Sequence, residues 1–174
     1  YKSLEFVNEM EENLKDIAKS LKVEEKKIKE AVDRLKDSQK ELEKSYNDLQ
    51  LKLIKYEIND FMSSVMDING IKVLIKSFEN KENNELKEIV DRVKEKLGSG
   101  VVLIGANNGN AMFLAGVSKE LTTKVKAGDI VREAAKIANG NGGGRPDFAQ
   151  AGGKDGEKVY EALEHGKRYL EGIL

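Results

Sequence analysis

Apolar residues repeat at steps of three and four along the first part of the chain, which is the period of an amphipathic helix. One stripe covers residues 2–21, and after an interruption near Lys22-Val23-Glu24 a longer stripe runs through residues 24–67. The longer stripe alternates strictly between steps of four and three over four heptads, as the seam of a coiled coil does. The stripes are Leu4, Val7, Met10, Leu14, Ile17 and Leu21, and Ile28, Val32, Leu35, Gln39, Leu42, Tyr46, Leu49, Leu53 and Tyr56. They predict an antiparallel helical hairpin.

The long helix is expected to pack on more than one surface. Near residue 54 its stripe shifts by one position, to Ile54, Ile58, Phe61, Val65 and Ile68. At about 1.5 Å per residue the helix spans roughly 65 Å, about twice the length of the first helix. A hairpin would therefore leave part of the seam uncovered, for a second protomer, a neighbouring domain of a longer chain, or the C-terminal half.

The pattern changes after Asn69-Gly70, which we predict to be the C-cap of the long helix. Strands are expected at residues 71–78, 101–106 and 111–117, with Asn107-Asn108-Gly109 as the turn of a hairpin. Helices are expected at residues 84–97, at 127–138 and from the N-cap Asp155 onward, with a short edge strand at 148–151. The predicted fold is α+β: a helical hairpin over residues 1–69, then a compact α/β domain with a mixed sheet over residues 70–174.

Glycine is concentrated in the segment GNGGGRPDFAQAGGK, residues 140–154, which also holds the only proline. Glycine permits positive φ and close approach of a ligand to the backbone, at an entropic cost. Bunched N–H groups beside Arg145 would form an anion-binding nest. A plain connection between two helices, with redundant glycines, is the alternative interpretation.

Composition and charge narrow the chemistry. The chain has no cysteine and a single histidine, His165, which excludes a thiol nucleophile, a thiolate zinc site and a histidine-based cluster. Residues 1–70 sum to −3 and residues 71–174 to +2, within a net charge of −1. Any contact with nucleic acid should therefore be local and salt-sensitive. No apolar run is long enough to span a membrane, and the missing cysteine is compatible with the cytoplasm.

Two further expectations concern the ends and the motifs of the chain. Its start, Tyr1-Lys2-Ser3-Leu4-Glu5, has no methionine and no signal sequence, so we expect a cut from a longer protein. Gly105-Ala106-Asn107-Asn108-Gly109 lacks the spacing of a dinucleotide fingerprint and leads into a strand, so the hairpin interpretation is preferred.

The segment Gly142 to Gly153, GGGRPDFAQAGG, closely resembles the signature of the C-terminal domain of alanyl-tRNA synthetases, the DHH-associated type called C-Ala. The resemblance extends over the whole chain, through AGDIV and EAAK before the motif and IAKSLKV in the front helices. It implies a module that is not itself catalytic, binds the outer corner of alanine-specific tRNA, couples aminoacylation with editing, and forms homodimers in some members. It also implies that the parent ligase uses ATP, Mg²⁺ and Zn²⁺ in upstream catalytic and editing domains of the same chain.

The same resemblance suggests which residues touch RNA. Gly142, Gly143 and Gly144 would let the backbone approach a phosphate or base edge, and Gly152 and Gly153 complete the motif. Arg145 would supply charge or stack on a base, Gln150 would hydrogen-bond, and Lys154 would add attraction. For Arg145 and Asp147, a mutual structural ion pair is the alternative. Lys119, Lys124 and Lys126 would widen the basic surface or merely be solvated.

Two other functions stay open at this stage. One is the substrate-binding domain of a DHH-type phosphoesterase, although those enzymes typically carry a histidine beside the glycine run. The other is a coiled-coil oligomerisation module whose globular end only caps the helices.

Overall fold

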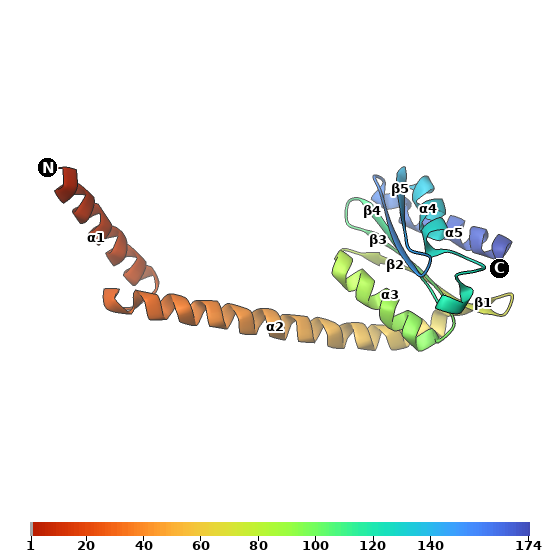
Figure 1. Cartoon of the computed structure of the whole chain (residues 1–174), viewed down its shortest axis with the longest axis horizontal. Coiled ribbons are helices and arrows are strands. Elements are labelled where there is room, and N and C mark those ends of the chain that lie inside the picture. Colours follow the sequence, from red (N-terminus) through yellow and green to blue (C-terminus); the bar gives the residue numbers. More distant parts are fainter. Residues whose placement is uncertain (1) are drawn as a thin grey trace. The chain divides into compact units, whose positions relative to one another are not determined.

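The computed structural model describes residues 2–174, with side chains from Leu4 onward, and forms two compact units that meet between Lys52 and Leu53 (Figure 1). The first unit contains helix α1 (Lys2–Ser20), the short 3-10 turn η1 (Glu25–Lys27) and most of helix α2 (Ile28–Phe61). No helix among residues 2–174 has the length and apolar character needed to cross a membrane.

Helix α1 ends where the sequence pattern is interrupted. Lys22 adopts a left-handed conformation with φ 55°. The Val23 N–H donates to the Ala18 carbonyl at 2.9 Å, and the Lys22 N–H donates to the Lys19 carbonyl at 3.1 Å. This pair of hydrogen bonds is a Schellman motif, which satisfies the last carbonyl groups of the helix.

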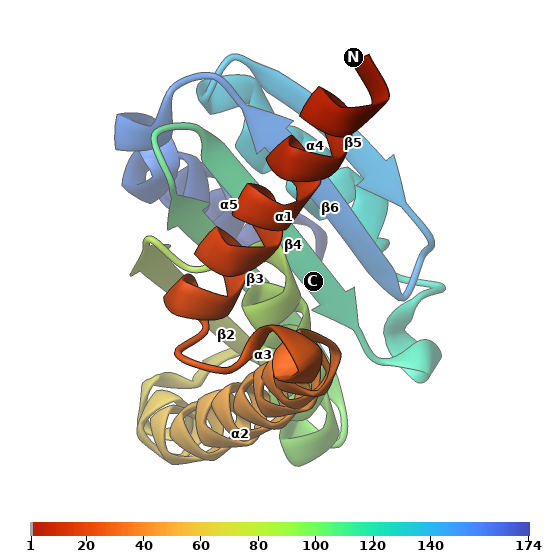
Figure 2. The ribbon, with the colours of Figure 1, turned by 90° about the vertical axis from the view of Figure 1, so that its left-hand side faces the viewer.

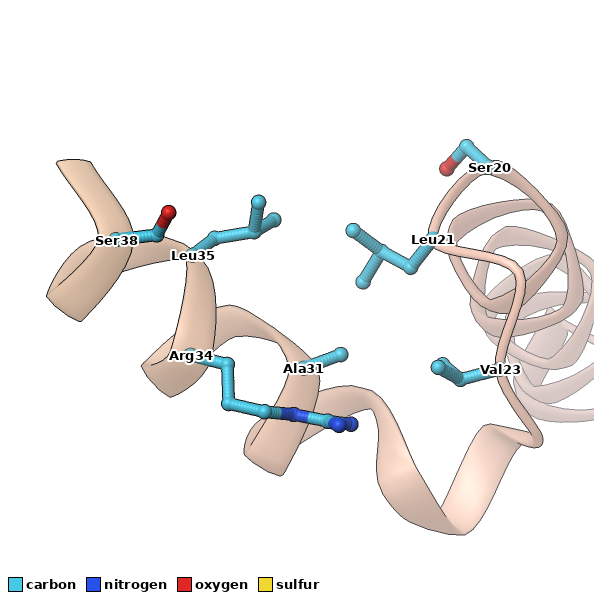
Figure 3. A pocket seen from close by; sticks show the side chains of 7 residues that line it. All are labelled: Ser20, Leu21, Val23, Ala31, Arg34, Leu35 and Ser38. Atoms are coloured by element: carbon cyan, nitrogen blue, oxygen red, sulfur yellow. The ribbon is translucent and has the colours of Figure 1, made fainter. Parts of the chain in front are cut away.

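The expected packing of α1 along α2 is not seen. Within the first unit, only Ala18 and Ala31 are buried among the residues whose side chains are described. Leu21 and Leu35 face each other across an open pocket of about 540 Å³ at the connection (Figure 3). The stripe residues farther from the connection, Leu4, Val7, Met10, Leu14, Leu42 and Leu49, are all exposed. The stripe predicts which face of a helix is apolar, whereas the turn decides where the next helix points.

The shift in the stripe near residue 54 is confirmed for Ile54, Ile58 and Phe61, but the predicted extension of the helix to residue 67 is wrong, because α2 ends at Phe61 and Ile68 belongs to strand β1 (Met66–Ile68). In the second unit, Ile54, Ile58 and Phe61 are buried in a core cluster with α3 (Asn83–Leu97) and one face of the sheet. The Phe61 and Phe78 rings meet edge to face with their centroids 5.4 Å apart. The last turns of α2 are therefore a structural part of the C-terminal unit.

The sheet has six strands in the order β1-β2-β3-β4-β6-β5 and is mixed, as predicted. Only β2 and β3 are parallel, with α3 as the crossover between them, and the other four pairs are antiparallel. The strands are β1 (Met66–Ile68), β2 (Ile71–Glu79), β3 (Gly100–Asn107), β4 (Ala111–Val117), β5 (Gly140–Gly144) and β6 (Phe148–Gly153). The predicted turn at residues 107–109 joins β3 to β4.

Helices cover both faces of the sheet (Figures 1 and 2). Helices α4 (Ala127–Ile137) and α5 (Val159–Ile173) pack on one face, around the fully buried Phe113, Leu103 and Ile130. On the other face, α3 and the end of α2 cover Leu74, Ile104 and Leu114. On this second face Gln150 and Gly152 of β6 and Asn141 of β5 are exposed.

Three expectations were wrong in their local structure. Asn69-Gly70 is not a helix C-cap but the two-residue turn between β1 and β2, with φ values of 52° and 85°. This is the geometry of a type I′ turn, which an Asn-Gly pair favours equally. Asp155 does not cap a helix with its side chain: it accepts a hydrogen bond from Asn139 Nδ2 at 2.6 Å, and α5 begins only at Val159 after a 3-10 turn.

The third error is the most informative. Residues 140–144, expected as a loop, form β5, the edge strand of the sheet, whereas the strand expected at the edge, β6, lies between β4 and β5. Glycine is rare in strands because it has no side chain that could pack against the neighbouring elements. In β5 the backbone of the glycines packs directly against β6.

Candidate nucleic-acid interface

Strands β5 and β6 form a closely packed hairpin. A Cβ added at Gly142 would overlap Ala151 and lie 2.5 Å from the Gln150 carbonyl oxygen. At Gly144 it would lie 2.6 Å from the Ala149 Cα and 2.7 Å from the Phe148 oxygen. Alternate positions of β5 therefore accept only glycine, because real Cβ atoms do not approach backbone atoms so closely.

The predicted anion nest is not formed. Such a nest needs successive residues in αR and αL conformations, but the glycines with positive φ among the described residues are Gly70, Gly98 and Gly109. Gly142, Gly143 and Gly144 lie in an extended strand instead. Gly143 is the least crowded of the three, since an added Cβ would find only the Arg132 guanidinium at 3.9 Å.

Arg145 lies in the turn at one end of the hairpin and pairs with Asp147, with Nε 3.1 Å from Oδ1. Backbone hydrogen bonds fix this turn: the Ala127 N–H donates to the Pro146 carbonyl, and the Val117 N–H to the Asp147 carbonyl, both at 2.9 Å. The ion pair proposed as an alternative for Arg145 and Asp147 thus exists. The Arg145 side chain remains 76% exposed, so it can still meet an anion.

Lys119, Lys124 and Lys126 are exposed in the segment between β4 and α4. Lys126 directly precedes Ala127, which is hydrogen-bonded to the Arg145 turn, so this segment and the turn share one end of the sheet. Glu120 lies in the same segment, and its pKa is lowered mainly by a hydrogen bond from the Ser99 side chain. Its carboxylate therefore stays charged at neutral pH and offsets part of the positive charge at this end.

A concave surface lies at the opposite end of the hairpin, which we call the amide groove. It comprises two adjoining hollows of about 310 and 480 Å³ that share Met112 and Gly152. The first is lined by Asn83, Met112, Asn141, Gln150, Ala151 and Gly152, and the second by Asn110, Ala111, Met112, Asn139, Gly140, Gly152, Gly153 and Lys154. Five of these side chains are neutral amides, Lys154 is the one charged residue, and none is a carboxylate.

The sheet register brings the lining residues together. Met112 of β4 lies directly opposite Gly152 of β6, which in turn lies opposite Asn141 of β5. Residues directly opposite in a sheet point to the same face, so Met112, Gly152 and Asn141 form one row across three strands. Gln150 is two positions along β6 and shares this face.

Asn83, the first residue of α3, has an unpaired acceptor atom. Its Oδ1 is buried and accepts no hydrogen bond from any residue within the described range. An unsatisfied buried acceptor costs about 1–3 kcal/mol. Asn83 lines the groove, but its Oδ1 is covered by protein atoms and does not open into the groove.

Four of the eight predicted contact residues line the amide groove: Gln150, Gly152, Gly153 and Lys154. Arg145 lies at the other end of the hairpin, on the order of 20 Å away at about 3.3 Å per strand residue. The predicted set therefore spans two separate surfaces. Sequence reasoning missed Asn83, Asn110, Met112, Asn139 and Asn141. A signal was nevertheless visible, because asparagine is frequent in the turn at residues 107–110 and again at residues 139–141.

Among residues 2–174, no group of three or more His, Asp or Glu side chains is placed to hold a metal ion.

The mixed six-stranded sheet with helices on both faces defines the class of the C-terminal unit, and residues 70–172 match the DHHA1 domain model. The chain belongs to the DHHA1 domain family. Among its relatives is an Alanine--tRNA ligase of Natranaerobius thermophilus, to which the chain is 39% identical over 163 residues. The match covers 92% of this chain and 19% of the relative. The chain thus spans about a fifth of the length of such relatives.

Solved structures agree with this assignment. The C-Ala domain from Aquifex aeolicus alanyl-tRNA synthetase is similar at a TM-score of 0.56 and 34% identity, over 63% of this chain and 96% of that one. The resemblance that the glycine-rich motif suggested is confirmed by these matches. RecJ from Thermus thermophilus shares the fold alone, at 12% identity and a TM-score of 0.53, over 87% of this chain and 21% of that one.

Proposed function

We propose that the chain is the tRNA-binding C-terminal region of an alanine–tRNA ligase, which contacts the outer corner of alanine-specific tRNA and couples aminoacylation with editing. In this proposal ATP, Mg²⁺ and Zn²⁺ serve catalytic and editing domains of a longer cytoplasmic enzyme. The observation that carries the proposal is the amide groove, because it combines hydrogen-bonding side chains with one lysine and no lining carboxylate. Amide and lysine side chains are the groups that contact exposed bases and phosphates of RNA.

The charge of the surface supports an auxiliary contact. Arg145 and Lys154 lie at opposite ends of one hairpin, and Lys119, Lys124 and Lys126 extend the Arg145 end. A tRNA lying along the hairpin would meet positive charge at both ends and amides between them. Because few charges are involved, the contact adds to binding by other domains and weakens steeply with salt.

The corner contact is tested by the affinity of the 174-residue chain for two RNAs. We expect full-length alanine tRNA to bind about tenfold or more tightly than an acceptor-stem minihelix, because the minihelix lacks the corner. Arg145→Ala and Lys154→Ala should each weaken tRNA binding by about two- to tenfold and each reduce the salt slope by about one. Fluorescence anisotropy at several salt concentrations provides both quantities.

Arg168→Ala is the matched control, since Arg168 is an exposed arginine of α5, on the opposite face of the sheet. It should leave the affinity for tRNA unchanged. Equal affinity of the unmodified chain for tRNA and minihelix would rule out the corner contact. A loss at Arg168 as large as at Lys154 would show that the interface lies elsewhere.

The exposed seam of α2 favours a second role, homodimerisation through the helical part. Leu42, Leu49 and Leu53 are 72%, 60% and 62% exposed, and a heptad seam of this kind gains stability by pairing. Sedimentation at several concentrations measures the mass. A dimer that dissociates on Leu42→Lys supports this role, and a monomer at all concentrations argues against it.

A further inference from the structure

We propose that the amide groove holds one unpaired nucleobase of the bound RNA, and that its side chains favour adenine. This inference rests on the proposed function, because it names the RNA group that the groove receives. It assigns a role to Met112 and Asn141, which no sequence motif indicated.

The floor of the groove fits a flat ring. A Cβ added at Gly152 would meet nothing closer than the Ala111 carbonyl oxygen, 3.9 Å away. Glycine at this position is therefore not required by packing, in contrast with Gly142, and its lack of a side chain keeps the floor open. Met112, half-buried and directly opposite Gly152, lines both hollows beside this opening. Methionine sulfur makes favourable contacts with aromatic rings, so a base can stack over this part of the sheet.

The amides suit the edge of adenine. Asn141 lies opposite Gly152, which puts it diagonally across from Gln150 on the same face. Diagonal neighbours are about 7–8 Å apart, within the reach of long side chains to a common partner. An Asn or Gln amide pairs with adenine by donating to N7 and accepting from the N6 amino group.

The adjoining hollow suits the sugar and phosphate of the same nucleotide. It continues from Met112 and Gly152 to Gly153 and Lys154, so a base over Gly152 brings its phosphate toward the lysine. Asp155, the nearest acidic neighbour in sequence, forms its ion pair with Lys158, at 3.8 Å, rather than with Lys154. The charge of Lys154 is thus left available to the phosphate.

The test compares single-stranded hexaadenylate and hexauridylate for binding to the 174-residue chain by fluorescence anisotropy. We expect hexaadenylate to bind about fivefold or more tightly, because one bidentate amide pair discriminates between bases by at least this factor. Gln150→Ala should abolish the preference by removing the amide. Gly152→Val should abolish it by filling the floor, with circular dichroism to confirm that the variant is folded.

Gly172→Ala is the matched control, because Gly172 lies near the end of α5, outside the lining of both hollows, and an added Cβ would meet no atom within 4 Å. It should keep the preference for adenylate. Equal binding of the two oligonucleotides, or a preference that survives both Gln150→Ala and Gly152→Val, would overturn the inference. If full-length tRNA still outcompetes the minihelix in that case, only the base assignment fails, whereas loss of that difference removes the proposed function itself.

Discussion

Gly142→Ala is expected to lower the free energy of unfolding of the C-terminal unit by about 3 kcal/mol, the upper part of the range for overpacking. The new methyl group would overlap Ala151 and crowd the Gln150 carbonyl. These obstacles belong to the backbone and Cβ of β6, which cannot rotate away as the end of a flexible side chain can. The hairpin must therefore open, and the contacts of β5 with α4 are strained with it. Urea unfolding followed by circular dichroism measures the loss.

Gly143→Ala, one residue along the same strand, provides the control. Its added methyl group has open space apart from the Arg132 guanidinium at 3.9 Å, and its backbone does not have positive φ. Replacing glycine by alanine at such a site reduces the entropy of the unfolded chain. We therefore expect unchanged or slightly higher stability. Equal losses in the two variants would contradict close packing at alternate positions, whereas no loss in either variant would favour a role for both glycines outside the fold.

The periodic spacing of apolar residues predicted most elements of the fold. This is because a helix or strand that buries one face must carry apolar residues at regular intervals. The strands around Val101 and Phe113 and the helices around Val90 and Ile130 all lie where their patterns place them. The same reasoning failed at Asn69-Gly70, because an Asn-Gly pair ends a helix and turns a hairpin through the same freedom of φ. Only the partner strand decides between the two outcomes.

The glycine-rich segment shows a second limit. Its order of residues identified the family, yet its structure was mistaken, because a strand is normally recognised by its side chains. The strand β5 forms because Gly142 and Gly144 let its backbone approach β6 closely. The spacing of residues in the sequence does not reveal that β6 is the neighbour. Gln150 and Lys154 line the amide groove, and their separation from Arg145 follows from the hairpin.

The amide groove was not predictable for a related reason. It combines Asn83 from the start of α3 with Met112, Asn141 and Gln150 from three different strands. The strand order β4-β6-β5 is what brings them together. The family resemblance pointed to all the glycines of the motif alike. In the fold, however, Gly152 has open space beside it, whereas Gly142 packs tightly against Ala151. The glycines that packing requires are thus distinguishable from those that it does not require.

Ile54→Ala is expected to destabilise the C-terminal unit by about 2–5 kcal/mol, the usual cost of truncating a buried aliphatic side chain to alanine. Ile54 is only 2% exposed and packs with the cluster that contains Ile89 and Leu114. Because Ile54 lies on α2, before the strands begin, this loss would show that the helix anchors the sheet domain.

Leu53→Ala separates that anchoring from the coiled-coil seam. Leu53 is adjacent in sequence and similar in size, but it is 62% exposed, so its truncation should change stability by no more than about 0.5 kcal/mol. Urea unfolding of both variants, at a protein concentration low enough to keep the chain monomeric, gives the comparison. A large loss for Leu53 and a small one for Ile54 would mean that the seam, and not the shifted stripe, holds α2 in place. If instead Ile54→Ala causes the larger loss of stability, Ile54 fixes the helix to the sheet. Leu53 is then free to contact a partner.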